Sequence, residues 1–245
     1  MNTKPMIGIV GLAGSGKDTL CNMLLERPEF RAYDRYAFAD PLKQFCMTAF
    51  GLTHDECYHP VVKEEVTVVL HDRSSVMFEH AYSALMWQYN KSTPNTAERD
   101  RMWRLTVDIL ESIDRRSLLG RLWHRLFGYS RYQVTPRDLL QRIGTDLFRV
   151  HVDEDFWVKL APTQAIIVPD VRFQNEVDHI LASGGHTIQI TSPGLVTTES
   201  TDHVSEKLAR SVIPGAIQIT NDKSLGLDAL RDIVDSLVQT MGNTK

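Results

Sequence analysis

A glycine-rich stretch near the N-terminus has the residue types and the spacing of a phosphate-binding loop. Gly11, Gly16 and Lys17 match the pattern G-x-x-x-x-G-K-[ST]. In this pattern glycines let backbone N–H groups turn towards a phosphate, and the lysine adds a positive charge. The last position holds Asp18 instead of a serine or threonine, and Thr19 follows one place late. The stretch therefore predicts binding of a β- and a γ-phosphate.

The carboxylate at position 18 has two interpretations. Magnesium prefers hard oxygen ligands, so Asp18 is a candidate for the place of the usual hydroxyl, with Thr19 as the alternative ligand. A negative charge in the first turn of a helix is also favourable by itself, because it complements the helix dipole. Both interpretations stay open from the sequence.

A second group of charged residues follows the apolar stretch AIIVPD. Asp170 ends this stretch, Arg172 comes two residues later, and Glu176 opens the next predicted helix. In parallel α/β sheets, ligands bind beyond the carboxyl ends of the strands. An acid, a base and an acid at such an edge suit a phosphate and a sugar together, which we favour over a salt-bridged loop.

Lys43 lies in the first turn of a helix that we expect to start with Asp40 as cap, to carry Pro41 in its first turn and to end at Gly51. A cation at the start of a helix opposes the helix dipole, at a cost of ~0.3–1 kcal/mol. An anionic ligand at this helix end would remove that cost. A solvated surface lysine is the alternative.

The helix expected from Pro136 carries two kinds of face. At 100° per residue, the apolar residues predicted to face the core are Leu139, Leu140, Ile143, Leu147 and Val150. A different face gathers Gln141, Gly144, Thr145 and Phe148. A glycine inside a helix costs about 1 kcal/mol relative to alanine, so Gly144 suits a place that something approaches closely. Packing against another helix is one explanation, and the polar neighbours Gln141 and Thr145 favour a ligand.

The elements that must position these residues alternate between strand and helix. We expect strands at 6–10, 36–39, 165–170, 186–191 and 216–220, and helices at 18–26, 40–50, 175–185 and 224–241 besides the helix from 136. This alternation predicts an α/β fold with a parallel sheet flanked by helices on both faces. Residues 53–134 lack it and indicate mostly helices, so we expect one domain over 1–245 with a helical insertion at about 53–134.

Composition excludes several classes of protein. The 245 residues carry a net charge of −4, which disfavours electrostatic binding of duplex nucleic acid. No apolar run approaches the ~18 residues of a membrane span, and the first residues lack the features of a signal peptide. Cys21, Cys46 and Cys57 form no CxxC pair, which is typical of reduced thiols. We expect a cytoplasmic protein, with a homodimer as a candidate assembly.

Six segments, taken together and in order, resemble the phage deoxynucleoside monophosphate kinases: GLAGSGKDT, FADPLK, PRDLLQRIGTDLFR, DFWVKL, IIVPDVRFQNEVDHI and ITNDKSL. The resemblance covers 6–51 and 137–238 and is weak between them. In that family an aspartate after the loop lysine is usual. The resemblance implies a P-loop kinase fold and transfer of the γ-phosphoryl group of ATP to a 5′-dNMP, with Mg²⁺ as cofactor. For a phage-encoded protein it implies the host cytoplasm.

The resemblance also implies roles for individual residues. It places ATP against Gly11, Ala13, Gly14, Ser15, Gly16, Lys17, Asp18 and Thr19. It places the acceptor against Lys43, Arg73, Gln141, Gly144, Thr145, Trp157, Asp170, Arg172 and Glu176. Lys17, Arg73 and Arg172 would act in catalysis, although Trp157 by residue type alone is more typical of a core aromatic. One of the eight arginines between Arg99 and Arg131 would close over the site as a lid arginine.

Two other functions remain possible from the sequence. A kinase of another phosphorylated acceptor, such as dephospho-coenzyme A or phosphomevalonate, would use the same loop. An ATP-binding regulatory or nucleic-acid-handling protein would bind ATP without transferring a phosphoryl group to a small molecule. The net charge of −4 disfavours a nucleic-acid-binding face.

Overall fold

The computed structural model describes residues 4–117, 131–195 and 208–242, without the side chains of residues 68 and 70–74. The chain divides into two compact units. We call Met1–Phe38 with Ala161–Lys245 the sheet unit, and Ala39–Leu160 the helical unit. The predicted insertion at 53–134 lies within the helical unit, which begins earlier and ends later than the insertion.

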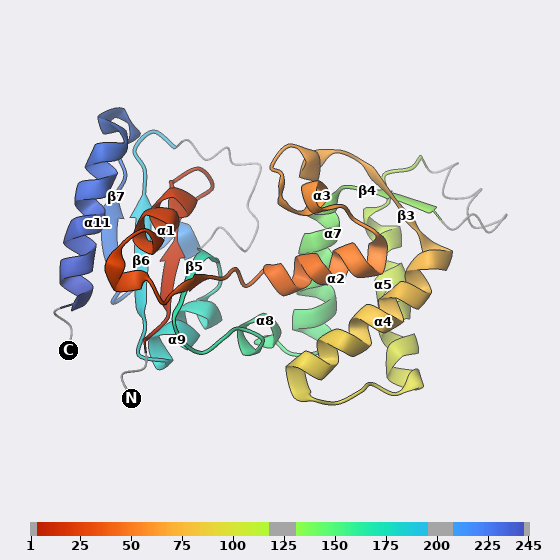
Figure 1. Cartoon of the computed structure of the whole chain (residues 1–245). Coiled ribbons are helices and arrows are strands. Elements are labelled where there is room, and N and C mark those ends of the chain that lie inside the picture. The colour runs from red at the N-terminus through yellow and green to blue at the C-terminus, as the bar shows by residue number, and fades with distance from the viewer. Residues whose placement is uncertain (1–3, 118–130, 196–207, 243–245) are drawn as a thin grey trace. The chain divides into compact units, whose positions relative to one another are not determined.

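The sheet unit contains a five-stranded parallel sheet (Figure 1). Its strands are β1 (Ile7–Val10), β2 (Asp34–Arg35), β5 (Ile166–Val171), β6 (His186–Thr191) and β7 (Ile217–Thr220). They lie in the order β2-β5-β1-β6-β7, and each neighbouring pair is parallel. The central strand β1 is buried along its whole length, as its continuous apolar run predicts.

Helices cover both faces of this sheet. On one face, Ile7 and Ile9 of β1 pack in a core that includes α1 (Lys17–Leu25) and α11 (Gly226–Gly242). On the other face, Gly8 lies against Ile180 of α9 (Gln174–Ala182), where an added Cβ would come within 2.4 Å of the Ile180 side chain. Short 3₁₀ turns form at Pro28–Phe30 and Lys223–Leu225. The predicted α/β fold with a parallel sheet flanked by helices is confirmed.

The second predicted strand was placed wrongly. We expected a strand at 36–39, but β2 ends at Arg35. The Tyr36 amide still donates to the Ile167 carbonyl at 3.0 Å, whereas the Phe38 amide donates to the Asp170 side chain at 3.0 Å. At Phe38 the Asp170 carboxylate thus takes the place of a backbone carbonyl of β5, and the chain leaves the sheet.

The helical unit consists mainly of helices (Figure 1). They pack around one core that is rich in aromatic side chains. Its elements are α2 (Asp40–Phe50), α3 (His54–Tyr58), η2 (Val62–Glu64), β3 (Thr67–Leu70), α4 (His71–Asn90), α5 (Thr96–Ile113), β4 (Arg131–Val134), α7 (Pro136–Arg142), η3 (Ile143–Arg149) and α8 (Phe156–Lys159). Strands β3 and β4 form an antiparallel pair. As predicted, α2 carries Pro41 in its first turn and ends at Gly51, which has a φ of 74°.

The helix from Pro136 changes to a π-helix at η3, and this change overturns part of the predicted core face. Val150 was expected inside but is 66% exposed, whereas Phe148 is fully buried. The Val150 amide donates to the Thr145 carbonyl five residues earlier. Wider turns rotate the later residues away from a projection at 100° per residue. Leu139, Ile143 and Leu147 are buried as predicted.

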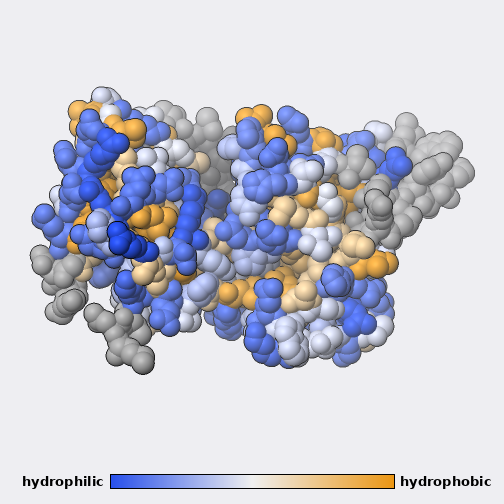
Figure 2. All heavy atoms as spheres, in the orientation of Figure 1, coloured by the Kyte–Doolittle hydropathy of each residue, from blue (hydrophilic) through white to orange (hydrophobic). Residues whose placement is uncertain are grey.

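The face of the molecule shown in Figure 2 mixes hydrophilic and hydrophobic residues. Among the helices of the described ranges, none combines the length and the apolar composition that a membrane-spanning helix needs.

Candidate functional site

The predicted phosphate loop connects β1 to α1, which is the context that the motif requires. Gly14 and Gly16 have φ angles of 76° and 101°, a region that other residues rarely adopt. An added Cβ at Gly16 would lie 2.4 Å from the Asn221 side-chain nitrogen, and one at Gly11 would lie 2.5 Å from the Ile190 carbonyl oxygen. Glycine is therefore required in this loop for two reasons: the backbone conformation and the close packing of neighbouring groups.

Asn221 holds this loop from a distant part of the chain. Its side-chain amide donates to the Ser15 carbonyl at 2.9 Å, and its backbone amide donates to the Thr191 carbonyl at 2.8 Å. It follows β7 and is only 7% exposed. The segment ITNDKSL carried the family resemblance, but the sequence assigned Asn221 no role.

Two polar groups in the loop suit a phosphate chain. The Lys17 ammonium donates to the carbonyls of Gly11 and Leu12 at 2.6 and 2.7 Å. Phosphate oxygens are stronger acceptors for a cation than these neutral carbonyls. The hydroxyl of Ser15 is buried and has no hydrogen-bond partner among the described residues. The donors of the loop thus fit an anionic ligand.

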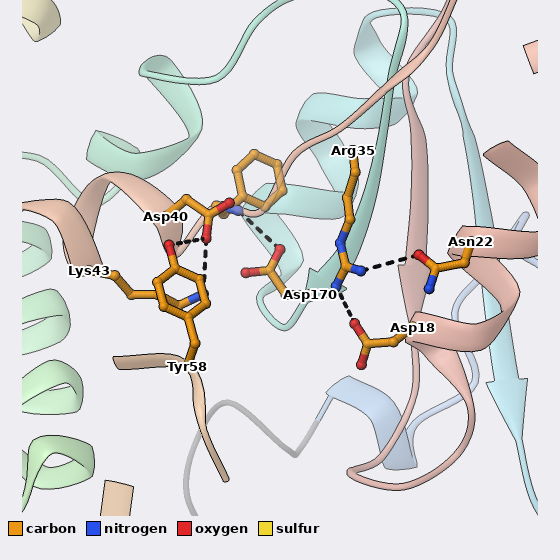
Figure 3. A network of polar contacts seen from close by, with 8 residues as sticks. Asp18, Asn22, Arg35, Asp40, Lys43, Tyr58 and Asp170 are labelled. Carbon is orange, nitrogen blue, oxygen red and sulfur yellow. Dashed lines mark hydrogen bonds and ion pairs between the residues drawn. The ribbon is translucent and has the colours of Figure 1, made fainter. Parts of the chain in front are cut away.

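Asp18, the predicted magnesium ligand, forms an ion pair with Arg35 (Figure 3). The same guanidinium donates to the Asn22 side chain at 3.3 Å. Both partners of the ion pair are exposed, and exposed ion pairs contribute little stability. The Asp18 carboxylate thus lies beside the loop with a weakly held partner. The sequence gave no signal for Arg35, which comes from a different element.

Asp170, Arg172 and Glu176 lie where β5 ends, at the same carboxyl edge as the neighbouring β1 and its loop. The Asp170 carboxylate accepts the Phe38 amide, and the Arg172 side chain is exposed. The buried Glu176 carboxylate accepts the backbone amides of Arg172 and Phe173 at 2.7 and 3.2 Å. Glu176 therefore caps α9 and fixes the backbone that carries Arg172.

Lys43 in the helical unit has a partner within its own helix (Figure 3). Its ammonium lies 2.9 Å from the Asp40 carboxylate, which also accepts the Tyr58 hydroxyl at 3.2 Å. The expectation that Asp40 caps α2 is wrong: Asp40 is the first helical residue, and no side chain caps the preceding Ala39. Asp40 therefore supplies a negative charge that offsets the unfavourable position of the Lys43 cation at the start of α2.

Gly144 packs closely against helix α2. An added Cβ at Gly144 would lie 2.6 Å from the end of the Leu42 side chain of α2, so packing against a helix is one cause of this glycine, and the ligand stays a prediction. The Trp157 indole donates to the Gly144 carbonyl at 3.0 Å and is 3% exposed. Trp157 is therefore a core aromatic that fixes the backbone at Gly144. Gln141 and Thr145 are partly exposed.

Several of the predicted arginines are engaged within the helical unit. Arg99 pairs with Glu79, Arg115 with Asp138, and Arg116 with Asp114. Burial raises the pKa of Asp114, but hydrogen bonds from Arg116 and from two backbone amides outweigh it and lower that pKa below its ordinary value.

The remaining arginines differ in what the structure says of them. Those that are described and exposed are Arg101, Arg104 and Arg131. Arg121 and Arg125 lie outside the described residues. The backbone of Arg73 lies in the first turn of α4, and its side chain lies outside the described ones.

Comparisons with known proteins identify the family of the chain. A family model described as deoxynucleotide monophosphate kinase matches residues 5–232. A putative deoxynucleotide monophosphate kinase of Acanthamoeba polyphaga mimivirus is 28% identical over 239 residues, which cover 90% of each chain. The deoxynucleotide monophosphate kinase of Enterobacteria phage T4 is 33% identical over 103 residues, or 38% of this chain and 42% of that protein. The chain belongs to the deoxynucleotide monophosphate kinase family, as its six sequence segments predicted.

Proposed function

We propose that this member of the family transfers the γ-phosphoryl group of ATP to the 5′-phosphate of a deoxynucleoside monophosphate. The observation that carries the proposal is the loop with Gly16 and Lys17 at the same sheet edge as Asp170 and Arg172. One edge thus carries donors for a phosphate chain and an exposed cation for a second phosphate.

ATP binding is supported by the local chemistry of the loop. Backbone amides between Gly11 and Thr19, together with the N-terminal end of α1, would receive the phosphate oxygens. Lys17 would exchange its two carbonyl acceptors for oxygens of the β- and γ-phosphates. The buried Ser15 hydroxyl would supply a further donor beside them.

Magnesium is part of the proposal because of Asp18. Its exposed carboxylate is a hard oxygen ligand next to the loop, and Thr19 offers a hydroxyl one residue on. When bound, Mg²⁺ would neutralise charge on the β- and γ-phosphate oxygens. Arg35 would have to share or release Asp18, which their exposed ion pair permits.

The residues proposed to hold the acceptor are those that the family resemblance implies: Asp170, Arg172, Lys43, Arg73, Gln141 and Thr145. Trp157 and Glu176 would act through the backbones that they fix, at Gly144 and at Arg172.

The reaction needs no general base from the protein. Monophosphate esters have a second pKa of about 6, so the attacking phosphate oxygen is already ionised at neutral pH. That oxygen forms the new bond to the γ-phosphorus, and the oxygen that bridges the β- and γ-phosphates leaves with ADP. The side chains would therefore align the two phosphates and offset their charge.

The setting of the reaction belongs to the same proposal. An arginine of the helical unit would stabilise charge as a lid residue, with Arg101, Arg104 and Arg131 as described candidates.

Three buried thiols, at Cys21, Cys46 and Cys57, suit a reducing compartment such as the cytoplasm of a host cell. Small nucleotides would be the partners, and a homodimer stays a prediction.

A label-transfer assay tests the proposal. ATP labelled in the γ-phosphate is mixed with a dNMP, and labelled dNDP is counted for the parent, for Lys17→Met and for Lys223→Met. Lys223 is an exposed lysine in the turn before α11 and serves as the matched control. We expect transfer in the parent and the control and nearly none in Lys17→Met. Equal transfer in all three would contradict the assignment of the loop.

A further inference from the structure

We propose that Tyr58 is a positioning residue for Lys43: its ring holds the ammonium ready for the acceptor phosphate of the proposed kinase reaction, and its hydroxyl holds the Asp40 carboxylate back from that phosphate. The inference rests on the proposed function of Lys43.

Three contacts form a closed set between α2 and α3 (Figure 3). The Lys43 ammonium lies 4.1 Å from the centre of the Tyr58 ring and 2.9 Å from an Asp40 carboxylate oxygen. The Tyr58 hydroxyl donates to that same oxygen at 3.2 Å. Each of the three side chains thus touches the other two.

This arrangement orders a side chain that is otherwise flexible. A lysine has many rotamers, and fixing it for a ligand costs entropy unless the protein has already fixed it. The Lys43 side chain is only 15% exposed. An aromatic face attracts a cation more strongly when the cation is partly desolvated. The ring therefore holds the ammonium before any ligand arrives.

Short-range contacts hold Tyr58 itself in place. Thr53 and Glu56 form a reciprocal capping box at the start of α3, with hydrogen bonds of 3.2 and 2.7 Å. The His54 ring stacks on the Tyr58 ring with their centres 4.4 Å apart. Cys57, the preceding residue, is fully buried in the core of the helical unit. The end of α3 is thus a fixed platform.

The hydroxyl of Tyr58 also keeps its proton at neutral pH. Burial raises the pKa of Tyr58 to about 12, and the neighbouring negative charge of Asp40 adds to this shift. The hydroxyl can therefore go on donating to Asp40 when the ammonium turns towards a phosphate. Asp40 then stays in place and does not follow Lys43 into contact with the anionic acceptor.

Steady-state kinetics with dNMP and ATP varied separately test this inference. We compare the parent with Tyr58→Phe, Tyr58→Leu, Lys43→Ala and the double variant Lys43→Ala/Tyr58→Leu. Tyr89→Phe is the matched control, because Tyr89 also donates to an aspartate, Asp153, in the same unit. A thermal melt of each variant reports folding.

We expect Tyr58→Leu to raise the KM for dNMP about tenfold and Tyr58→Phe by roughly threefold, because Phe keeps the ring face and loses only the hydroxyl. The KM for ATP and the control should stay at parent values. In the Lys43→Ala background, Tyr58→Leu should add nothing further, because a residue that acts through Lys43 has nothing left to position.

Three results would overturn the inference. The first is an unchanged KM for dNMP in both Tyr58 variants. The second is an equal rise of the KM values for dNMP and ATP, which marks a general structural defect. The third is an undiminished Tyr58→Leu effect in the Lys43→Ala background. If Tyr58→Leu does not fold, Tyr58→Phe and Asp40→Asn decide by the same KM split. Failure of the proposed function is distinct, since the parent itself would then make no dNDP.

Discussion

The Asn221 side chain donates a hydrogen bond of 2.9 Å to the carbonyl oxygen of Ser15, so a residue after the last strand of the sheet holds the loop after the first. The same amide nitrogen fills the space next to Gly16 that any side chain would need. The hydrogen bond thereby fixes the orientation of the peptide between Ser15 and Gly16. A loop that must present backbone amides to phosphates depends on such a fixed orientation.

Asn221→Asp should weaken ATP binding by about tenfold or more, because it removes the donor and leaves a carboxylate facing the Ser15 carbonyl. Calorimetric titration with ATP and with adenosine measures the effect, and only the ligand with phosphates should lose affinity. Asp222→Asn, which changes the neighbouring residue in the following turn, is the control. Parent affinity for ATP in Asn221→Asp would show that the loop needs no such support.

Asp18→Ala should shift the magnesium dependence of the reaction to higher concentration, while binding of metal-free ATP changes less. The reason is that the Asp18 carboxylate offers a hard oxygen next to the loop. Arg35→Met removes the ion-pair partner of Asp18 and keeps the carboxylate. It should leave the magnesium titration near that of the parent. An identical shift in both variants would reduce Asp18 to a partner of Arg35.

Arg172→Ala should raise the KM for dNMP or lower kcat by roughly ten- to a hundredfold, because a charge-assisted hydrogen bond contributes ~1.5–3 kcal/mol. ATP affinity should change little, since the loop is untouched. Arg231→Ala, which removes another exposed arginine of the sheet unit, is the control. Loss of ATP binding with intact dNMP binding would move Arg172 away from the acceptor.

The lowered pKa of Asp153 makes the free energy of unfolding depend on pH. Hydrogen bonds from Lys159 and Tyr89 lower the pKa of Asp153 to about 2, below its usual value near 3.9 in an unfolded chain. A lowered pKa contributes stability above the unfolded value, and that contribution is lost as the pH falls towards 2. Asp153→Asn should therefore unfold more easily at pH 7, by roughly 1 kcal/mol, because Lys159 is half exposed and solvent screens its ion pair with Asp153. Urea unfolding should show this difference shrinking between pH 4 and 2, and a pH-independent difference would contradict the shift.

The fold could be predicted because its signals are local. Buried parallel strands produce apolar runs such as that of β1, and helices end at glycines such as Gly51, whose left-handed backbone is visible in the residue type. The errors arose where a distant group intervened. The Asp170 carboxylate accepts the Phe38 amide, so β2 ends before the predicted strand at 36–39. The π-helix turns Val150 towards solvent.

The candidate site was predictable in its motifs and not in its contacts. The loop glycines and Lys17 follow a fixed spacing, so the sequence located them. Arg35 and Asn221 have no such spacing, because each acts on the loop or on α1 from another element. For Gly144, the sequence showed that something approaches closely, but only packing identified Leu42 as that group.

A panel of acceptors decides whether a deoxynucleoside monophosphate accepts the γ-phosphoryl group. The four dNMPs, dephospho-coenzyme A, phosphomevalonate and a sample without acceptor are each incubated with ATP and magnesium, and the phosphorylated products are separated and quantified. The proposed function predicts dNDP and a matching amount of ADP with at least one dNMP, and neither product in comparable amount from the other samples. ADP formed equally without acceptor, or product only from a non-nucleotide acceptor, would contradict it.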